Sequence, residues 1–404
     1  MHFIELLHTN EIEDLVNLVK NNPRLSDFVL KKTKLEPEIR MWVAEQIKCR
    51  ENASKKLPSF FEKNTLFTQR GLEQATHESV ALVKTKLLPF KPKLVLDLTA
   101  GLGSDLFAYE NIASTLIYND LDTHLVFLAK YNSIKLGISQ KVQILNFSAN
   151  QIFEQLKGIT VDLVLMDPDR RSGNSRFISM EEYSPNPKEL EETILRSGKN
   201  LLTKLSPMLS IKEITQSFKH VHTIFVVSYR NEVKEISTLH SLESNKGEKV
   251  RITCVDVYSE NKFQTVTFNT AEQTLPLRVS NQLGKYFYEP YKAIIKSGYA
   301  DTYAGQSNLE SISANIPYYT SNNVVSKFMG RVFSVLYEGR FSVKEVRNTC
   351  KKFKVEKASL SARGFYEKAE ALEKTLNMKP STEYFMFFYL DYSKNPRFCL
   401  TVPI

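Results

Sequence analysis

Two short apolar runs in the sequence each end in an acidic residue. Asp97 ends the run that begins at residue 94, and Asp167-Pro168 follows the run over residues 161–166. Runs of this length and composition are typical of buried parallel strands. In open α/β sheets, ligands bind at the carboxyl ends of the strands, where a carboxylate can meet an amine or a hydroxyl group. The spacing therefore predicts a ligand site that contains both carboxylates.

A turn of small residues follows the first run. It extends from Thr99 to Gly103 and contains Gly101-Leu102-Gly103, and Asp105 then stands where it can cap a following helix. Glycines at such a turn let a ligand approach the backbone closely. The dinucleotide pattern Gly-x-Gly-x-x-Gly is incomplete, because Leu106 occupies the third glycine position, and this argues against a nicotinamide or flavin enzyme. Taken alone, the Gly-x-Gly also fits an ordinary tight turn.

The stretch from Leu94 to Asp105 resembles motif I of the class I S-adenosylmethionine (SAM)-dependent methyltransferases, an acidic residue followed by Gly-x-Gly. The resemblance implies that SAM is the cofactor and that an acidic residue at the end of the next strand binds its ribose hydroxyls. Asp120 fits that role better than Asp122, which could instead cap the next helix. The cofactor-binding residues implied in this region are Asp97, Thr99, Gly101, Gly103, Asp105 and Asp120.

The adenine contacts depart from the family pattern. Many relatives place an acidic residue after the third strand, whereas this sequence has Asn146-Phe147-Ser148 there. Ser148 is the candidate to hydrogen-bond the adenine edge, and Phe147 either stacks on the base or joins the core. In many methyltransferases the element before motif I covers the methionine end of SAM. Gln74, Thr76 and Glu78 are therefore candidates to line the site, and a capped surface helix is the alternative.

The second stretch, Asp167-Pro168-Asp169-Arg170-Arg171, looks like motif IV of nucleic-acid methyltransferases. Enzymes that methylate exocyclic amines carry Asp-Pro-Pro and an aromatic residue, and here no aromatic residue follows. The residue pattern is nearer to the strand-end motif of the RNA uracil C5-methyltransferases. Those enzymes also need a cysteine nucleophile. Only Cys254 lies late in this domain, so we discount that mechanism without excluding it. The resemblance implies that the Asp167 carboxylate and the Pro168 carbonyl orient the target group. Asp167 is also one of the predicted cofactor-binding residues.

Arg170 and Arg171 are the predicted phosphate clamp of the substrate, and Arg170 is placed among the catalytic residues with Asp167 and Pro168. The alternative is a set of surface ion pairs with Asp169, or with Glu181 and Glu182.

The elements that would position these residues give an α/β fold. We expect a helical region over residues 1–90, a doubly wound SAM-binding domain with a seven-stranded sheet over 91–262, a small α+β (ferredoxin-like) linker domain over 263–330, and a basic domain over 331–404. The seventh strand is predicted at 249–258, and a basic strand at 351–355.

The last segment holds 14 Lys and Arg against 8 Asp and Glu, a net charge of +6 out of +9 for the chain. Its layout, with Arg363-Gly364-Phe365 before a helix, resembles the THUMP-like C-terminal domain of a group of bacterial class I methyltransferases. That resemblance, with a basic surface that suits phosphates, implies RNA as partner and adds Arg363 to the predicted substrate-binding residues.

Composition limits the remaining choices. The 404 residues contain no apolar run of membrane-spanning length and no basic leader, and the four cysteines are far apart. We therefore expect a cytoplasmic protein without a membrane partner or a metal site. The predicted function is SAM-dependent methylation of a base in structured RNA, ribosomal or transfer. The alternatives are a non-catalytic RNA-binding or assembly protein on a methyltransferase scaffold, and a protein or small-molecule methyltransferase.

Overall fold

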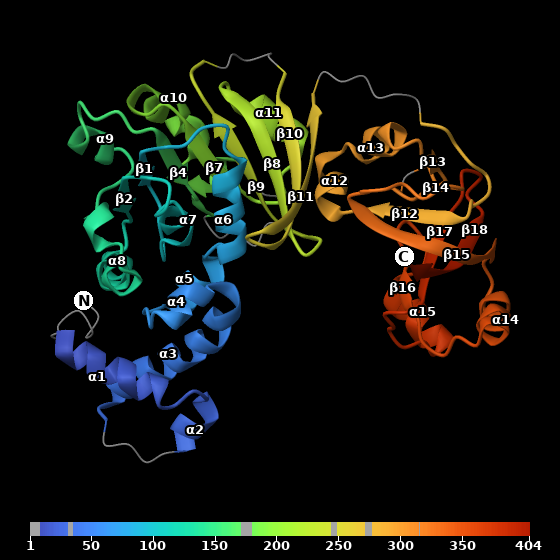
Figure 1. Ribbon diagram of the computed structural model, residues 1–404, viewed down its shortest axis with the longest axis horizontal. Helices are drawn as coiled ribbons and strands as arrows, with labels where there is room; N and C mark the ends of the chain where they lie inside the picture. Colours follow the sequence, from blue (N-terminus) through green and yellow to red (C-terminus); the bar gives the residue numbers. More distant parts are fainter. Residues whose placement is uncertain (1–8, 31–34, 171–179, 244–248, 271–276, 315) are drawn as a thin grey trace. The chain divides into compact units, whose positions relative to one another are not determined.

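The computed structural model describes residues 9–30, 35–170, 180–243, 249–270, 277–314 and 316–404 (Figure 1). The chain forms two compact units. The first contains most residues up to 263, and the second contains residues 264–404 together with 231–233 and 252–256.

The first unit begins with helices. Proline stands in the first turn of α3 and of α4, where its missing N–H costs no hydrogen bond. Two buried amides then fix the segment that leads to α5: Gln46 of α3 bonds both backbone polar groups of Phe67, and Asn132 bonds those of Leu66. This clamp holds the start of the chain against the sheet domain. The helices are α1 (Thr9–Lys20), α2 (Leu25–Leu30), α3 (Pro37–Lys56), α4 (Pro58–Glu62), α5 (Gln69–Gln74) and α6 (Glu78–Leu87).

A nine-stranded sheet follows, in the order β11-β10-β8-β9-β7-β4-β1-β2-β3 (Figure 1). Strands β3, β2, β1, β4 and β7 run parallel, so their carboxyl ends lie at one edge. The strands are β1 (Leu94–Asp97), β2 (Thr115–Asn119), β3 (Val142–Leu145), β4 (Leu163–Met166), β7 (Leu201–Leu205), β8 (Val221–Tyr229), β9 (Glu232–His240), β10 (Arg251–Ser259) and β11 (Lys262–Asn269).

Helices and one short ribbon connect these strands. Residues of α9 and α10 pack with the central strands in one apolar cluster that includes Ile152, Ile194 and Leu96. Asn186 caps α10 and Ser210 caps α11. The connecting elements are α7 (Ser104–Phe107), α8 (Thr123–Leu136), η2 (Ser139–Lys141), α9 (Ile152–Gln155), β5 (Asp169–Arg170), η3 (Met180–Glu182), β6 (Tyr183–Ser184), α10 (Pro187–Ser197) and α11 (Ile211–Ser217).

The identity of the seventh strand differs from the prediction. The strand that pairs antiparallel with β7 is β9, and the predicted strand at 249–258 is β10, which lies beyond β8. Arg230 and Asn231 both have positive φ, +50° and +62°, and connect β8 to β9 in a two-residue turn. Such a turn suits the twist of a hairpin. The sheet therefore contains the predicted strands, the one at 249–258 included as β10, together with β9, which was not predicted, and β11.

The second unit is built on one seven-stranded sheet, in the order β13-β14-β12-β15-β18-β17-β16. The segment before residue 330 and the segment after it contribute strands to this same sheet, which pair through β12 and β15. The elements are β12 (Tyr286–Pro290), α12 (Lys292–Ser297), α13 (Ala300–Gln306), β13 (Glu310–Ser311), β14 (Tyr319–Ser321), β15 (Gly330–Arg340), α14 (Val343–Phe353), β16 (Ser359–Ser361), α15 (Ala369–Leu376), β17 (Phe385–Leu390) and β18 (Pro396–Pro403).

The predicted basic strand at 351–355 is wrong. Residues 351–353 form the last turn of α14, and Lys354, with φ of +55°, ends the helix in the left-handed conformation. Val346 of α14 and Leu372 of α15 pack against the sheet residues Met386 and Phe398. The lysines at the end of α14 therefore project from a helix that is held by its apolar face.

Candidate functional site

The ends of β1 and β4 are joined by the side chain of Thr99. Asp97 Oδ1 accepts a hydrogen bond from Thr99 N at 3.0 Å, and Thr99 Oγ1 accepts one from Asp167 N at 2.8 Å. Because β1 and β4 are paired neighbours, these bonds fix both predicted carboxylates at the same edge of the sheet. Asp97, Thr99 and Asp167 are thus brought together as the sequence predicts.

The glycine turn provides an open surface beside these carboxylates. Gly101 has φ of +56°, and a Cβ atom built on it would meet no atom within 4 Å. Gly103, with φ of +82°, begins α7, and a Cβ there would lie 2.6 Å from Phe107 Cε2. Gly103 is therefore required by close packing, whereas Gly101 leaves its face free for a ligand.

Asp120 is connected to the same turn. Its Oδ2 atom accepts from Gly101 N at 2.8 Å and its Oδ1 atom from Asp122 N at 2.9 Å. Each oxygen keeps a further lone pair, so the carboxylate can still accept from hydroxyl groups. Asp122 caps α8 by accepting from His124 N. The sequence reasoning missed Asn119, whose buried amide bonds Leu98 O and Phe147 O; a polar residue at the end of an apolar strand was its only signal.

Ser148 lies in the turn after β3. Its Oγ atom donates to Gln151 Oε1 at 2.8 Å, and its carbonyl oxygen accepts from Gln151 N and Ile152 N. Nearby, Asn146 Nδ2 donates to Asp120 O at 2.6 Å. Ser148 thus shapes the turn near Asp120, and its contact with adenine stays a prediction.

A buried ion cluster lies behind Asp105, and two of its members were missed from the sequence. Lys84 of α6 contacts Asp105 Oδ1 at 2.7 Å and Glu235 Oε1, on β9, at 2.8 Å. The Lys84 side chain is 7% exposed and that of Glu235 is 2% exposed. Burial raises the pKa of Asp105, but the Lys84 and Lys204 ammonium groups and the hydrogen bond from Thr76 together hold that pKa below its usual value. Asp105 therefore anchors α7 to α6 rather than facing open solvent.

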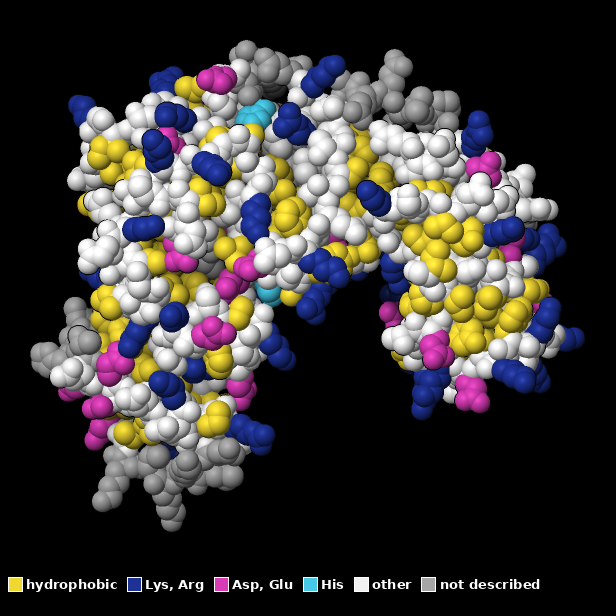
Figure 2. All heavy atoms as spheres, viewed as in Figure 1, with side chains coloured by type: hydrophobic (Ala, Val, Ile, Leu, Met, Phe, Trp, Pro, Cys, Tyr) yellow, Lys and Arg dark blue, Asp and Glu magenta, His cyan; other side chains and the backbone are white. Residues whose placement is uncertain are grey.

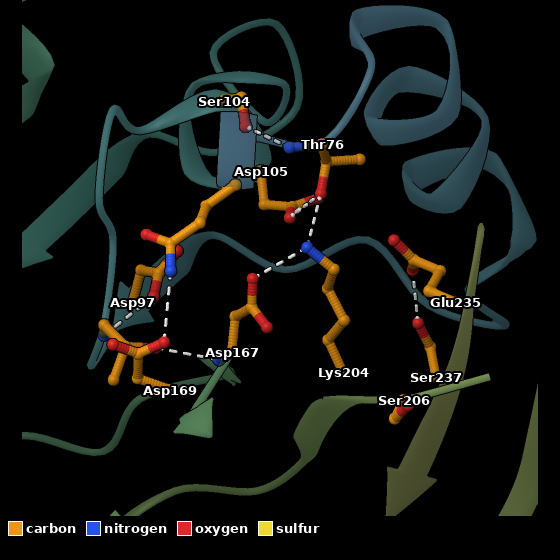
Figure 3. A network of polar contacts seen from close by, with 12 residues as sticks. Thr76, Asp97, Ser104, Asp105, Asp167, Asp169, Lys204, Ser206, Glu235 and Ser237 are labelled. Carbon is orange, nitrogen blue, oxygen red and sulfur yellow. Dashed lines mark hydrogen bonds and ion pairs between the residues drawn. The ribbon is translucent and has the colours of Figure 1, made fainter. Parts of the chain in front are cut away.

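A second ion pair joins the ends of β4 and β7 (Figure 3). Lys204, near the end of β7, donates to Asp167 Oδ2 at 2.7 Å and to Thr76 Oγ1 at 3.1 Å. Thr76 in turn donates to Asp105 Oδ2 at 2.6 Å. A small cavity of about 20 Å³ lies between these groups, bounded by Lys84, Asp97 and Lys204 among others, and it is large enough for one water molecule. Lys204 was not predicted, although a lysine near the end of an apolar strand was visible.

The charges at this edge favour a cationic ligand. Burial raises the pKa of Asp97 well above its usual value, with further contributions from Asp105 and Asp167. Burial also raises the pKa of Asp120. Within the described residues, no Lys or Arg forms an ion pair with either carboxylate. SAM carries a sulfonium and an ammonium group, so its charge and the open face of Gly101 fit these residues.

The carboxylate of Asp169 contacts two side chains of α5. Asp169 accepts from Arg70 Nη2 and, at 3.1 Å, from Gln74 Nε2, both on α5. Asp169 and Arg170 pair with β6 as a two-stranded ribbon. Arg171 lies outside the described residues, and only the backbone of Arg170 is described. Their role as a phosphate clamp stays a prediction.

Of the three candidates before motif I, two lie at the site. Thr76 contacts Asp105 and Lys204, and Gln74 contacts Asp169. Glu78 instead accepts from Ser59 N at 2.9 Å, which ties α6 to α4.

Arg363 belongs to the second unit and faces a buried carboxylate there. Its Nη2 atom is 3.3 Å from Glu289 Oε1, and Arg331 Nε donates to Glu289 Oε2 at 2.7 Å. Cys254 is buried with its Sγ atom donating to Ala293 O, and burial raises its pKa to about 12. Burial therefore disfavours the thiolate form of Cys254 that C5 chemistry would require.

The described residues contain neither a membrane-spanning helix nor a metal-binding cluster. None of the helices in the described ranges has the length and apolar character needed to cross a membrane. Over the same ranges, no group of three or more His, Cys, Asp and Glu side chains is arranged to hold a metal ion.

Comparison with known proteins places this geometry in context. The THUMP domain-like family matches residues 330–401. Proteins from two strains of Mycobacterium tuberculosis, each named an uncharacterized S-adenosylmethionine-dependent methyltransferase, are 23% identical over 345 residues, 84% of this chain and 90% of theirs. A crystal structure of a proposed methyltransferase from Porphyromonas gingivalis W83 superposes with a TM-score of 0.88 at 26% identity, and covers 98% of this chain and 99% of that one.

Proposed function

We propose that this chain, a class I SAM-dependent methyltransferase with a THUMP-like C-terminal domain, methylates structured RNA, ribosomal or transfer. The observation that carries the RNA assignment is the row of exposed cations on the THUMP-like domain, beside an edge of its sheet. A cytoplasmic location, where such RNA is found, belongs to the same proposal.

The cofactor side of the proposal rests on the residues at the ends of β1 and β2. Asp97, the open face of Gly101 and the carboxylate of Asp120 would hold SAM, with Thr99 and Gly103 fixing the turn between them. When bound there, SAM supplies a methyl group that is activated by its attachment to a sulfonium. The protein's own contribution is then to hold donor and acceptor in a reactive geometry.

The RNA side of the proposal rests on exposed lysines that form no ion pair in the described part of the chain. Lys344, Lys351, Lys352 and Lys354 are exposed along and beyond α14, and none forms an ion pair in the described part of the chain. Figure 2 shows Lys and Arg side chains gathered at the end of this unit that carries α14 and α15. Exposed lysines bind phosphates without reading sequence, as a domain that presents structured RNA requires.

A groove of about 710 Å³ lies next to these lysines. Two lysines, Lys354 and Lys357, and two glutamates, Glu356 and Glu383, border it together with hydroxyl-bearing residues such as Ser359, Ser381 and Tyr384. Ammonium and hydroxyl groups are the side chains that most often contact the sugar-phosphate backbone. We therefore assign this groove to the RNA backbone.

Calorimetric titration with SAM and with its demethylated product tests the cofactor site, with an Asp97→Ala variant as control. We expect micromolar binding by the wild type and its loss in the variant. Transfer of a labelled methyl group to bulk RNA from a strain that lacks the gene then tests the substrate, with total protein and small-molecule extracts of that strain as alternative acceptors. Label in protein or in small molecules, but not in RNA, would overturn the RNA assignment. RNA binding without any SAM binding would indicate a scaffold that is not catalytic.

A further inference from the structure

We propose that the methyl acceptor is a hydroxyl oxygen, the 2′-oxygen of a ribose, held between the Lys204 ammonium and the Asp167 carboxylate. This inference rests on the proposed RNA function, and it replaces the base predicted from the sequence motif with a sugar. The observation behind it is the ion pair at the end of β4 and β7, which the motif alone does not reveal (Figure 3).

Both members of the pair keep bonding capacity toward an acceptor. Lys204 uses two of its three N–H groups, on Asp167 Oδ2 and Thr76 Oγ1, and the third has no partner among the described residues. In the same ranges, Asp167 Oδ1 has no side-chain or backbone donor. The two side chains are 20% and 41% exposed, so both reach the open face of the site. One free donor and one free acceptor side by side match a hydroxyl group, which both accepts and donates.

The sign of the charge that develops during the reaction separates an oxygen acceptor from a nitrogen acceptor. A neutral amine that receives a methyl cation becomes positively charged, and an ammonium beside it opposes that change. A hydroxyl oxygen that gives up its proton gains negative charge, and an ammonium stabilises it. Lys204 is therefore suited to an oxygen acceptor and unsuited to an exocyclic amine.

The surroundings of Lys204 keep it protonated. Burial alone would lower its pKa, but Asp167, Glu235 and Asp105 together hold the pKa above its usual value. Glu235 is fixed in turn by Lys84 and by Ser237 Oγ, which donates to it at 2.6 Å. Lys204 is thus a donor rather than a base. Burial raises the pKa of Asp167 although Lys204 offsets part of the effect, which makes its free oxygen the better proton acceptor.

Methyl transfer to the ribose oxygen needs no group of the protein beyond Asp167 and Lys204. The ribose oxygen forms a bond to the methyl carbon as the bond between that carbon and the sulfonium sulfur breaks, and the sulfur keeps the electron pair and becomes a neutral thioether. The hydroxyl proton passes to Asp167 Oδ1 and then to water. Lys204 donates a hydrogen bond to the oxygen throughout and keeps its own proton.

The remaining features of the site agree with a sugar. Inside an RNA chain the 3′- and 5′-oxygens are esterified, so the 2′-hydroxyl is the free one on each ribose. No aromatic residue follows Asp167-Pro168 to stack on a base, and Asp169 is occupied by Arg70 and Gln74. Methylation of a base carbon by the C5 mechanism needs a cysteine thiolate, and Cys254 is buried against Ala293 in the second unit.

Nucleoside analysis of cellular RNA tests the inference and separates it from the proposed function. RNA from a strain that lacks the gene is digested and examined by mass spectrometry, beside RNA from strains complemented with wild type, Lys204→Met, Lys204→Arg or Lys199→Met. Lys199 is the matched control, because it forms an ion pair of 2.8 Å with Asp162 at the other end of β7. Calorimetry with the demethylated cofactor shows whether the Lys204→Met protein is folded and binds.

We expect the deletion to remove one 2′-O-methylnucleoside, and wild type and Lys199→Met to restore it. With purified protein and bulk RNA, Lys204→Met should lower the rate by about 10²–10³-fold, as removal of a donor to a developing oxyanion does, and Lys204→Arg should recover part of it. A lost nucleoside that carries its methyl on the base would overturn the inference and leave the RNA function standing. Unchanged RNA would overturn the RNA function itself. Full activity of Lys204→Met would remove Lys204 from the reaction.

Discussion

The buried cluster of Lys84, Asp105 and Glu235 makes a sharp prediction about stability. Lys84→Met keeps the apolar stem of the side chain but removes the ammonium from between two carboxylates, at 2.7 and 2.8 Å. A buried carboxylate without its counter-ion is costly, and breaking a buried pair in this way typically costs about 3–5 kcal/mol. For a unit of this size the loss corresponds to a fall in Tm of about 6–20 °C.

The pH dependence of the loss provides a second signature. In the wild type the pKa of Asp105 is held below its unfolded value, so its contribution is fully present above that value and falls only in stronger acid. Without Lys84, Lys204 and Thr76 still lower the pKa of Asp105, but we expect burial, the largest single effect, to outweigh them and to raise that pKa above its unfolded value. The folded variant then binds more protons than the unfolded chain, and its stability rises as the pH falls from 7 to 5.

Chemical denaturation followed by tryptophan fluorescence measures both effects, because the single Trp42 lies in α3 of the same unit. Lys199→Met is the control: the Lys199 side chain is 63% exposed, and its pair with Asp162 should contribute no more than about 1 kcal/mol. A loss below about 1 kcal/mol for Lys84→Met, or a loss that does not shrink between pH 7 and 5, would refute the ion-cluster reasoning.

Three further predictions concern other parts of the chain. Gly103→Ala should destabilise the protein by about 1–3 kcal/mol more than Gly137→Ala, because both glycines have φ near +80° but only a Cβ at Gly103 meets a neighbour, Phe107; equal losses would contradict the packing argument. Arg363→Ala should cost about 1–3 kcal/mol in denaturation experiments, because it leaves the buried Glu289 with Arg331 alone; lost RNA affinity at unchanged stability would assign Arg363 to the substrate instead. Replacing Lys351, Lys352 and Lys354 together by Gln should reduce the salt dependence of RNA binding by a slope of about 2–3, whereas Lys212→Gln on α11 should leave it unchanged; an unaltered slope for the triple variant would remove the phosphate role of α14.

The sequence predicted the central strands because each is a short apolar run followed by a polar turn. The parallel order then brings Asp97, Asp120 and Asp167 to one edge without any further information. Strand β9 was missed because most of its residues are polar, and yet Glu235, Ser237, Thr238 and His240 are all buried. Their burial depends on partners that are distant in sequence, such as Lys84 for Glu235 and Glu191 for His240.

The two lysines of the site were hidden for a related reason. A lysine in a helix, such as Lys84, or near a strand end, such as Lys204, is ordinarily a surface residue. Only the contact of α6 with α7 and the pairing of β7 with β4 turn these lysines toward Asp105 and Asp167. The motif at Asp167 shows which carboxylate faces the acceptor, but the cation paired with it, which decides the acceptor chemistry, comes from a strand 37 residues away.

The distribution of charge along the edge links the cofactor and acceptor proposals. Lys204 neutralises Asp167, while Asp97 and Asp120 have no cation beside them in the described residues. The unbalanced negative charge therefore lies where a sulfonium and an ammonium are expected, and the balanced end lies where the acceptor is expected. A hydroxyl enters that end as a neutral group and leaves its proton on Asp167, so the balance is kept through the reaction. An amine would add a positive charge next to Lys204, and for that reason the same arrangement that favours SAM at one end favours an oxygen acceptor at the other.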